Sequence, residues 1–352
     1  GKRPEAELLA VMKHVRFATM AASFLHGTVK AWPALDSKDG QSMLLNATLP
    51  AADGTKPVPR WGCGPRLIYV MGGESDGNER FSNMELYDLR ATSWTQLASM
   101  TRPRVMFGCV ALQGKLYAVG GTGPSSHALD TAEVYDPQTD GWQLLAKMST
   151  KRCSFTLAAV SGKIYAIGGS VIAGGGMVLN SGEAYDPQLG TWAPVASMSE
   201  KRRYHASVVL DGKIYIMGGQ VDNGDGLEMA EVYDPQANNW QRVASMPRGQ
   251  SLHAAAAMGG KIYVTGGFIQ GDVLSSVYVY DPQADAWTQL ASMGTARRLH
   301  ASAVVGGKLY VFGGHGTENR LSTVEVYDPA SDNWAQESSL PSMRSSMMAI
   351  AL

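Results

Sequence analysis

The stretch Gly212-Lys213-Ile214-Tyr215-Ile216-Met217-Gly218-Gly219, continued by Glu231-Val232-Tyr233-Asp234-Pro235 and Trp240, decides the fold because it is one unit of a repeat. A Gly-Gly pair returns six times, at intervals of 47 to 50 residues. Each pair is followed by Tyr-Asp, with a Trp seven residues after the Tyr. The repeat positions are Gly72, Gly73, Tyr87 and Trp94; Gly120, Gly121, Tyr135 and Trp142; Gly168, Gly169, Tyr185 and Trp192; Gly218, Gly219, Tyr233 and Trp240; Gly266, Gly267, Tyr280 and Trp287; and Gly313, Gly314, Tyr327 and Trp334.

Each unit contains the signals of four short strands. Leu116-Tyr117-Ala118-Val119 is rich in β-branched and aromatic residues, starts after Gly-Lys and ends at Gly-Gly, which is typical of a strand entered from a tight turn. The glycines suit positive φ or a close backbone approach. Asp136-Pro137 then matches the start of a type I turn before the strand of Trp142. Four strands in about fifty residues favour a β-propeller blade over a solenoid unit.

The two ends of the repeat region predict how the ring closes. Leu340 to Leu352 reproduces only the first strand of a unit, whereas the first unit starts at its second strand, Leu67 to Met71. We therefore expect Arg344 to Leu352 to complete the first blade and to remove both sheet edges. The predicted fold is an all-β six-bladed propeller closed by a carboxyl-terminal strand, in which the repeat tryptophans are buried structural residues.

Charge, cysteine content and hydropathy restrict the function classes. The 352 residues carry a formal net charge of -1 and 17% charged residues, so we expect neither nucleic-acid nor membrane binding through a global basic field. Three separate cysteines, without a signal peptide or a run of eighteen apolar residues, favour a soluble protein in a cytoplasmic, reducing compartment. Because the chain begins with Gly1 and not Met, one interpretation is a fragment of a longer protein.

The amino-terminal part lacks the repeat. In residues 1–32, apolar residues such as Leu8, Met12 and Val15 have helical spacing, which predicts a short α-helical segment. Residues 33–60 lose this periodicity and gather proline and glycine, as in a linker. The propeller is expected to occupy residues 61–352.

The spacing of Gly-Gly, Tyr and Trp resembles the kelch repeat, and residues 1–32 resemble the end of a BACK domain as found in BTB-BACK-kelch proteins. This resemblance implies a protein-binding module, the substrate-recognition propeller of an adaptor for a cullin-RING ubiquitin ligase. Cullin would then be bound only through upstream domains that this chain does not contain. The repeat departs from the pattern at Leu89, which replaces a proline, and at Tyr278, which stands where the other units have Glu85, Glu133, Glu183, Glu231 and Glu325.

One repeat position, four residues beyond the Met or Leu that closes each unit, carries arginine in five units. We expect these side chains to encircle one mouth of the central channel and to hold an acidic peptide segment of a partner protein. The alternative is that each one bonds carbonyls of an adjacent blade and holds the ring together. The candidate partner-binding residues of this group are Arg104, Arg152, Arg202, Arg297 and Arg344, joined by Arg203 and Arg298, with Gln250 as the exception.

Two more arginines are candidates because the fold does not require them. Arg80 and Arg320 each lie seven residues before the repeat Tyr, whereas the other blades have Ala128, Val178, Gly226 and Val273 there. The alternative for both is a solvated loop charge.

Metal binding and catalysis are not expected. His205, His253 and His300 share one repeat position, but Phe107, Phe155 and Met347 occupy it in the other blades, which indicates a packing position and not a zinc site. Outside the repeat positions no cluster of Cys, Tyr and His suggests an enzyme, so we predict no cofactor. A structural protein bound to actin or another filament remains an alternative, and a kelch-propeller enzyme is less favoured.

Overall fold

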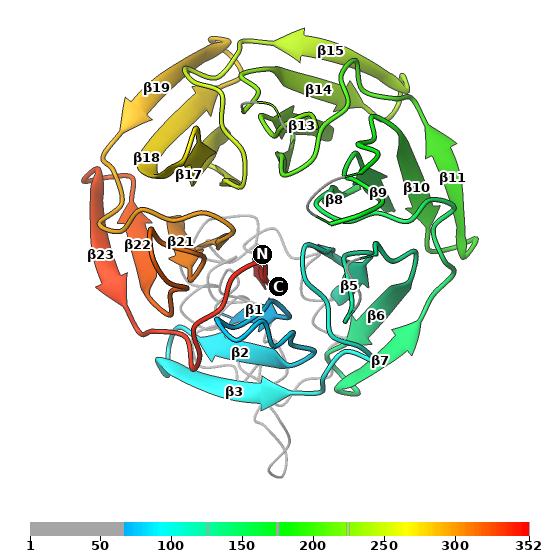
Figure 1. Cartoon of the computed structure of the whole chain (residues 1–352), viewed down its shortest axis with the longest axis horizontal. Helices are drawn as coiled ribbons and strands as arrows, with labels where there is room; N and C mark the ends of the chain where they lie inside the picture. The colour runs from blue at the N-terminus through cyan, green and yellow to red at the C-terminus, as the bar shows by residue number, and fades with distance from the viewer. Residues whose placement is uncertain (1–66, 125–126, 174–175, 223, 225, 352) are drawn as a thin grey trace, which may run out of the picture. The chain divides into compact units, whose positions relative to one another are not determined.

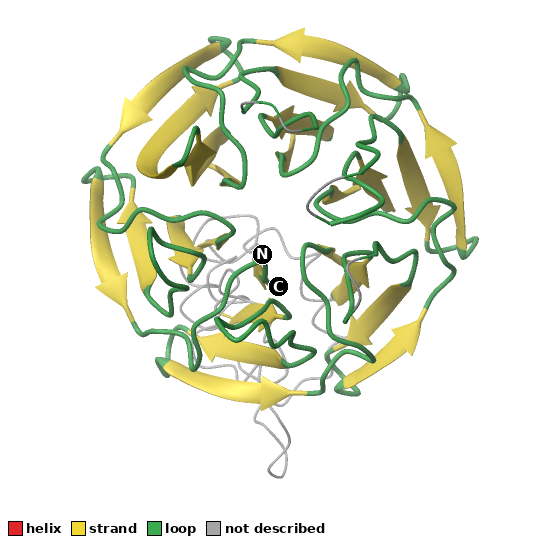
Figure 2. Ribbon diagram, in the orientation of Figure 1, coloured by secondary structure: helices red, strands yellow, loops and turns green. Residues whose placement is uncertain are grey.

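Residues 67–351, apart from 125–126, 174–175, 223 and 225, are described by the computed structural model. They form six four-stranded antiparallel sheets around a common axis (Figure 1). Strands and loops account for all of this region, without a helix (Figure 2). The prediction of an all-β six-bladed propeller is confirmed.

Each sheet is one blade, and we name its strands in order from the axis outward. Blade I consists of β24 (Met348–Ala351), β1 (Leu67–Met71), β2 (Met84–Asp88) and β3 (Ser93–Leu97). Blade II consists of β4 (Gly108–Leu112), β5 (Lys115–Val119), β6 (Ala132–Asp136) and β7 (Gly141–Leu144). Blade III consists of β8 (Thr156–Val160), β9 (Lys163–Ile167), β10 (Gly182–Asp186) and β11 (Thr191–Val195).

The remaining blades repeat this order. Blade IV consists of β12 (Ala206–Leu210), β13 (Lys213–Met217), β14 (Ala230–Asp234) and β15 (Asn239–Val243). Blade V consists of β16 (Ala254–Met258), β17 (Lys261–Ile269), β18 (Asp272–Asp281) and β19 (Ala286–Leu290). Blade VI consists of β20 (Ala301–Val305), β21 (Lys308–Phe312), β22 (Val324–Asp328) and β23 (Asn333–Glu337).

The first and last strands meet in blade I. β24 pairs antiparallel with β1, in a register that places Ala351 opposite Ile68 and Met348 opposite Met71. Closure by the carboxyl-terminal strand is therefore confirmed. It gives blade I the same four strands as the other five blades and covers the inner edge of β1.

The hydrophobic core lies between blades. Six clusters of buried side chains occupy the six interfaces; in one of them, Tyr69 and Met71 of blade I pack with Phe107 and Leu116 of blade II. The outermost strands contribute little, because their residues are mostly exposed or half-buried. Each blade thus depends on both neighbours for burial of its faces.

The Gly-Gly pairs have the backbone conformation that the repeat predicted. Gly120 and Gly121 have φ of 61° and 83°, and a Cβ on Gly120 would lie 2.6 Å from the carbonyl oxygen of Arg152. A larger residue would clash with the segment that leads into the next blade.

Each repeat tyrosine packs against the tryptophan of its blade; the rings are stacked in blade I and tilted in the other five blades. Tyr233 is buried, and its ring centroid lies 4.9 Å from that of Trp240. The expectation that the tryptophans are buried is wrong, because all six are half-buried on the outer strands. Each indole N–H instead donates to a carbonyl at the end of the preceding blade, as Trp240 Nε1 does to Ala196 at 2.9 Å. Trp240→Ala should therefore cost less than the about 3–5 kcal/mol expected for a fully buried aromatic residue.

The predicted helical segment 1–32 and linker 33–60 lie outside the described residues, as do positions 61–66 of the predicted propeller. In the described part of the chain, no helix has the length and apolar character needed to span a bilayer.

Deletion of residues 344–352 should prevent stable folding, because it exposes the inner edge of β1 and opens the interface between blades VI and I. Thermal unfolding and size-exclusion chromatography of the truncated and full chains measure this. A truncated chain that is monomeric and melts at the full-length temperature would contradict ring closure as the stabilising contact.

Candidate functional site

Two sets of loops meet at one end of the ring. One set joins the outer strand of each blade to the inner strand of the next, and the other follows each Gly-Gly pair. Short backbone bridges connect the two sets, as between Val105 and Thr122 or between Arg203 and Gln220. We call this end of the propeller the loop face. The opposite end carries tight hairpins such as Gln113-Gly114 between β4 and β5. Longer connections make the loop face the more variable surface.

The repeat arginines of the loop face are buried, not exposed. The exposed fraction is 0% or 1% for Arg104, Arg152, Arg202, Arg297 and Arg344. An exposed ring formed by these five guanidinium groups is therefore a wrong prediction. The alternative, in which each arginine holds neighbouring blades together, accounts for their contacts.

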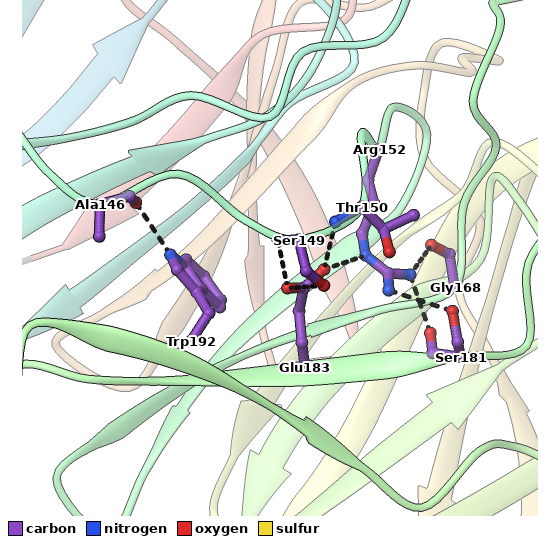
Figure 3. A network of polar contacts seen from close by, with 8 residues as sticks. All are labelled: Ala146, Ser149, Thr150, Arg152, Gly168, Ser181, Glu183 and Trp192. Atoms are coloured by element: carbon purple, nitrogen blue, oxygen red, sulfur yellow. Dashed lines mark hydrogen bonds and ion pairs between the residues drawn. The ribbon is translucent and has the colours of Figure 1, made fainter.

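Arg152 shows the arrangement (Figure 3). Its Nε lies 3.2 Å from Glu183 Oε1, and its Nη1 donates to the carbonyls of Gly168 and Ser181 at 3.0 and 2.8 Å. Its own carbonyl accepts the N–H of Gly121 from blade II at 2.8 Å. One residue thus bonds to blade II through its backbone and to blade III through its side chain.

The paired glutamate completes the network. Glu183 also accepts the backbone N–H and the hydroxyl of Ser149, at 2.8 and 2.9 Å, and thereby fixes the segment between the two blades (Figure 3). Burial lowers the pKa of the Arg152 guanidinium, and the charge of Glu183 opposes that shift. A guanidinium keeps its proton in such a site, so the pair remains ionic.

The same pairing recurs in four other blades. The corresponding pairs are Arg104 with Glu133, Arg202 with Glu231, Arg297 with Glu325 and Arg344 with Glu85.

Blade V is the exception at both positions. Gln250 replaces the arginine and Tyr278 replaces the glutamate of the same pair. Gln250 keeps the backbone link, since its carbonyl accepts Gly219 N–H at 2.9 Å, and its Nε2 donates to the Gly266 carbonyl at 3.0 Å. Gln250 and Tyr278 therefore replace both members of the ion pair that the other five blades contain. The sequence contained the signal, because both fall in the same blade.

Arg152→Gln or Glu183→Tyr alone should lower the free energy of unfolding by about 3–5 kcal/mol, because each leaves a buried charge without its partner. The double variant reproduces the pair of blade V and should recover part of that loss. The recovery is partial because Ser149 N–H loses its acceptor. Urea unfolding followed by tryptophan fluorescence measures all three; additive losses in the double variant would contradict a coupled pair.

The centre of the loop face is a closed ring of backbone hydrogen bonds. One residue per interblade segment donates its N–H to the carbonyl of the equivalent residue in the neighbouring blade, and six such bonds complete the circle. Five of them measure 2.9 Å, and the sixth, across the seam where the chain ends meet, measures 3.4 Å. We call this ring the mouth belt; it consists of Met106, Ser154, Tyr204, Leu252, Leu299 and Ser346.

The mouth belt requires a left-handed backbone in residues other than glycine. All six have φ between 53° and 58°, a conformation that costs on the order of 1–3 kcal/mol per residue. The side chains of Met106, Tyr204, Leu252 and Leu299 are half-buried, and the Tyr204 hydroxyl reaches to 4.0 Å from Met106 Sδ, two blades away. The surface around the axis is therefore mainly apolar, which no motif in the sequence indicated.

Arg203 and Arg298 flank the mouth belt two blades apart. Arg203 is 2% exposed; its Nη2 donates to the Asp222 carbonyl, and its guanidinium lies 5.2 Å from the Tyr204 ring centroid. Arg298 is half-buried, 4.6 Å from the Phe268 ring centroid. No carboxylate of the described residues forms an ion pair with either one. Their role in partner binding stays a prediction.

Arg320 and Arg80 lie on loops of adjacent blades. Arg320 forms ion pairs with Glu74 at 2.9 Å and Asp76 at 3.2 Å and donates to Ser345 Oγ, so it bridges the seam between blades VI and I. Arg80 is half-buried and pairs through its backbone with Glu74. Arg320 thus has anionic partners within the chain, which an acidic peptide would need to replace.

The three histidines occupy a packing position, as the repeat predicted. His205, His253 and His300 are buried, and a Cβ on the first Gly of the preceding blade would contact each ring. Burial lowers the pKa of His253 to about 4 and those of His205 and His300 well below the usual value. Across the described residues, no group of three or more His, Cys, Asp or Glu side chains is placed to hold a metal ion.

His253→Phe should flatten the pH dependence of stability. The unfolded histidine binds a proton below about pH 6.5 and the folded one only below about 4, so the unfolded state binds more protons in this window. The free energy of unfolding should therefore decrease as the pH falls below 6.5, by up to about 3 kcal/mol from His253. Phe is the natural residue at Phe107 and Phe155, so the variant should fold. If the free energy of unfolding changed with pH equally in the wild type and in His253→Phe between pH 4 and 6.5, that would contradict a buried neutral imidazole.

Comparison with known proteins agrees with this geometry. Residues 41–219 and 154–352 match the family described as the KLHDC2/KLHL20/DRC7 Kelch-repeats domain. The chain belongs to this kelch-repeat family. Over 50 residues it is 44% identical to Kelch-like protein 41b and 38% identical to Kelch-like protein 41a, both from Danio rerio. These segments cover 14% of this chain and only 8% of each relative.

A solved structure shares the fold. The structure of YjhT superposes with a TM-score of 0.67, over 81% of this kelch chain and 99% of the other, at 16% sequence identity. At that identity the likeness concerns the fold alone.

Proposed function

We propose that this kelch propeller is the substrate-recognition part of a BTB-BACK-kelch adaptor, and that it binds a partner protein through the loop face. Kelch propellers are a type of protein-interaction module, and the chain belongs to such a family. The adaptor role rests on the resemblance of residues 1–32 to the end of a BACK domain and on the short matches to kelch-like proteins. Contacts with cullin would belong to segments beyond this chain.

The observation that carries the proposal is the composition of the mouth belt. Three apolar side chains, Met106, Leu252 and Leu299, and the aromatic Tyr204 are half-buried in the belt, where the loops of every blade converge. Apolar and aromatic anchors at the centre of a polar rim are typical of protein interfaces. Arg298 is half-buried next to the belt and suits a partner segment that combines an apolar residue with an acidic one, whereas Arg203 is buried.

An intracellular location is part of the proposal. Cys109 and Cys153 are buried free thiols, and burial raises the pKa of both. Buried protonated thiols beside no disulfide partner suit a reducing compartment.

Crosslinking mass spectrometry on the full chain would identify partners, and affinities would then be measured with the purified partner. Arg298→Glu should weaken binding at least tenfold at low salt and less at high salt, whereas Leu299→Ser should weaken it at any salt concentration. Lys163→Gln, on the opposite end of the ring, is the matched control and should change nothing. Folded Arg298→Glu and Leu299→Ser variants with wild-type affinity would refute binding through the loop face.

The adaptor role has a separate test in the full-length protein. The variants that lose the partner should also lose its ubiquitination in cells, while Lys163→Gln keeps it. A partner that binds the loop face but whose ubiquitination does not change would leave a binding module without the adaptor role.

A further inference from the structure

A cavity of about 220 Å³ lies at the outer edge of blade II, away from the mouth belt. It opens between the segments that enter and leave the blade and the start of β6. Three of its lining side chains are cationic, Arg102, Lys147 and Lys151, and Asp130 is the one acidic lining residue. The exposed side chain of Leu144 adds an apolar surface to its lining. The lining therefore has a net charge of about two positive units.

These cations are not required by the fold. Lys147 stands where the other five blades all have serine, namely Ser99, Ser197, Ser245, Ser292 and Ser339. Arg102 stands where four of the other blades have Thr150, Glu200, Thr295 and Ser342. Two departures from the repeat thus add positive charge to one cavity.

The charges of this cavity are poorly compensated within the chain. Among the described residues no carboxylate forms an ion pair with Arg102 or Lys151, and Lys147 reaches Asp130 only at 3.8 Å. Arg102 Nε is buried and has no hydrogen-bond partner in that region. The buried Arg104 lies close enough for the charge of Arg102 to help lower its pKa, after the larger effect of burial. An anion beside Arg102 would relieve this repulsion between like charges.

Blade V supplies an internal comparison. Arg248 occupies the repeat position of Arg102 and lines a cavity of about 430 Å³ between blade V and Thr317 of blade VI. The other polar side chains there are hydroxyls and Asp272, with Ser292 at the position of Lys147. That cavity therefore has one cation and one carboxylate. A net positive lining is therefore found in the blade II cavity but not in the blade V cavity, although both contain an arginine at the same repeat position.

We propose that the blade II cavity binds a phosphate group, carried by a phosphorylated side chain of a partner polypeptide or present as a free phosphomonoester. A phosphate group has a charge of about −1.5 to −2 at neutral pH and offers three acceptor oxygens, which matches the net charge and the donors of this lining. Guanidinium groups give bidentate contacts to phosphate, and ammonium groups add point charge. Leu144 favours an apolar residue next to the phosphorylated one. The site is independent of the proposed partner contact at the mouth belt.

Titration calorimetry on the full chain, in a buffer free of phosphate, tests the site with four probes. They are the peptide Ac-Gly-phosphoserine-Leu-Gly-amide, its unphosphorylated form, the same peptide with glutamate, and inorganic phosphate. We expect the phosphopeptide to bind at least tenfold more tightly than the serine and glutamate peptides, and less tightly as salt rises. Tighter binding of the phosphopeptide than of inorganic phosphate identifies a phosphorylated partner; equal binding identifies the phosphate group alone as the ligand.

Lys147→Ser and Arg102→Thr use residues that other blades carry at these positions, so both variants should fold. Each should weaken phosphopeptide binding at least tenfold, whereas Arg248→Gln in blade V should leave it unchanged. Phosphopeptide binding that is absent, that glutamate matches, or that Lys147→Ser leaves intact would overturn the proposal. The mouth-belt variants do not enter this titration, so its failure and failure of the proposed function are distinguishable.

Discussion

A guanidinium group buried between two blades, and paired there with a glutamate, is the contact on which this propeller depends. Backbone ladders hold each blade together, but they do not cross from one blade to the next. Burying an arginine alone would be costly, and the cost is offset only because glutamate and backbone carbonyls satisfy its donors. Since the carbonyl of the same residue accepts an N–H from the preceding blade, each pair orders both neighbours and the segment between them.

This contact also separates the structural from the variable surface. Arg152 and its equivalents are buried below the loop face, and the loops above them differ in sequence. The loops that follow the Gly-Gly pairs are similar in length but differ in sequence and charge from blade to blade, and blade V extends its two middle strands into a long hairpin. Such a division allows one rigid ring to present different surfaces.

The repeat made the fold predictable, because Gly-Gly, Tyr and Trp are each needed for a backbone or packing reason that recurs in every blade. Ring closure was predictable from the incomplete units at the two ends. The same periodicity misled the interpretation of the arginines. A residue that recurs in five of six blades satisfies a need that recurs in them, and here that need is the pairing with Glu183 and its equivalents. Departures from the repeat, such as Lys147, have no such recurring structural reason, and the proposed phosphate site rests on them.

The mouth belt could not be predicted, because no residue type marks it. Its members share a left-handed backbone and a place in a circle of hydrogen bonds, and both arise only when six blades close. Its side chains range from the hydroxyls of Ser154 and Ser346 to the apolar Leu299, so the sequence has no common residue type at this position.

The circular arrangement of these six peptide groups has an electrostatic consequence. In a helix the peptide dipoles add along one axis and create a positive end that attracts anions. Around the mouth belt each N–H donates to its neighbour in the same rotational sense, so the in-plane dipoles of the circle cancel. The six peptide groups of this circle therefore have no net dipole in the plane of the ring. In the proposed interaction at the mouth belt, the side chains of Met106, Tyr204, Leu252 and Leu299 would therefore select the partner.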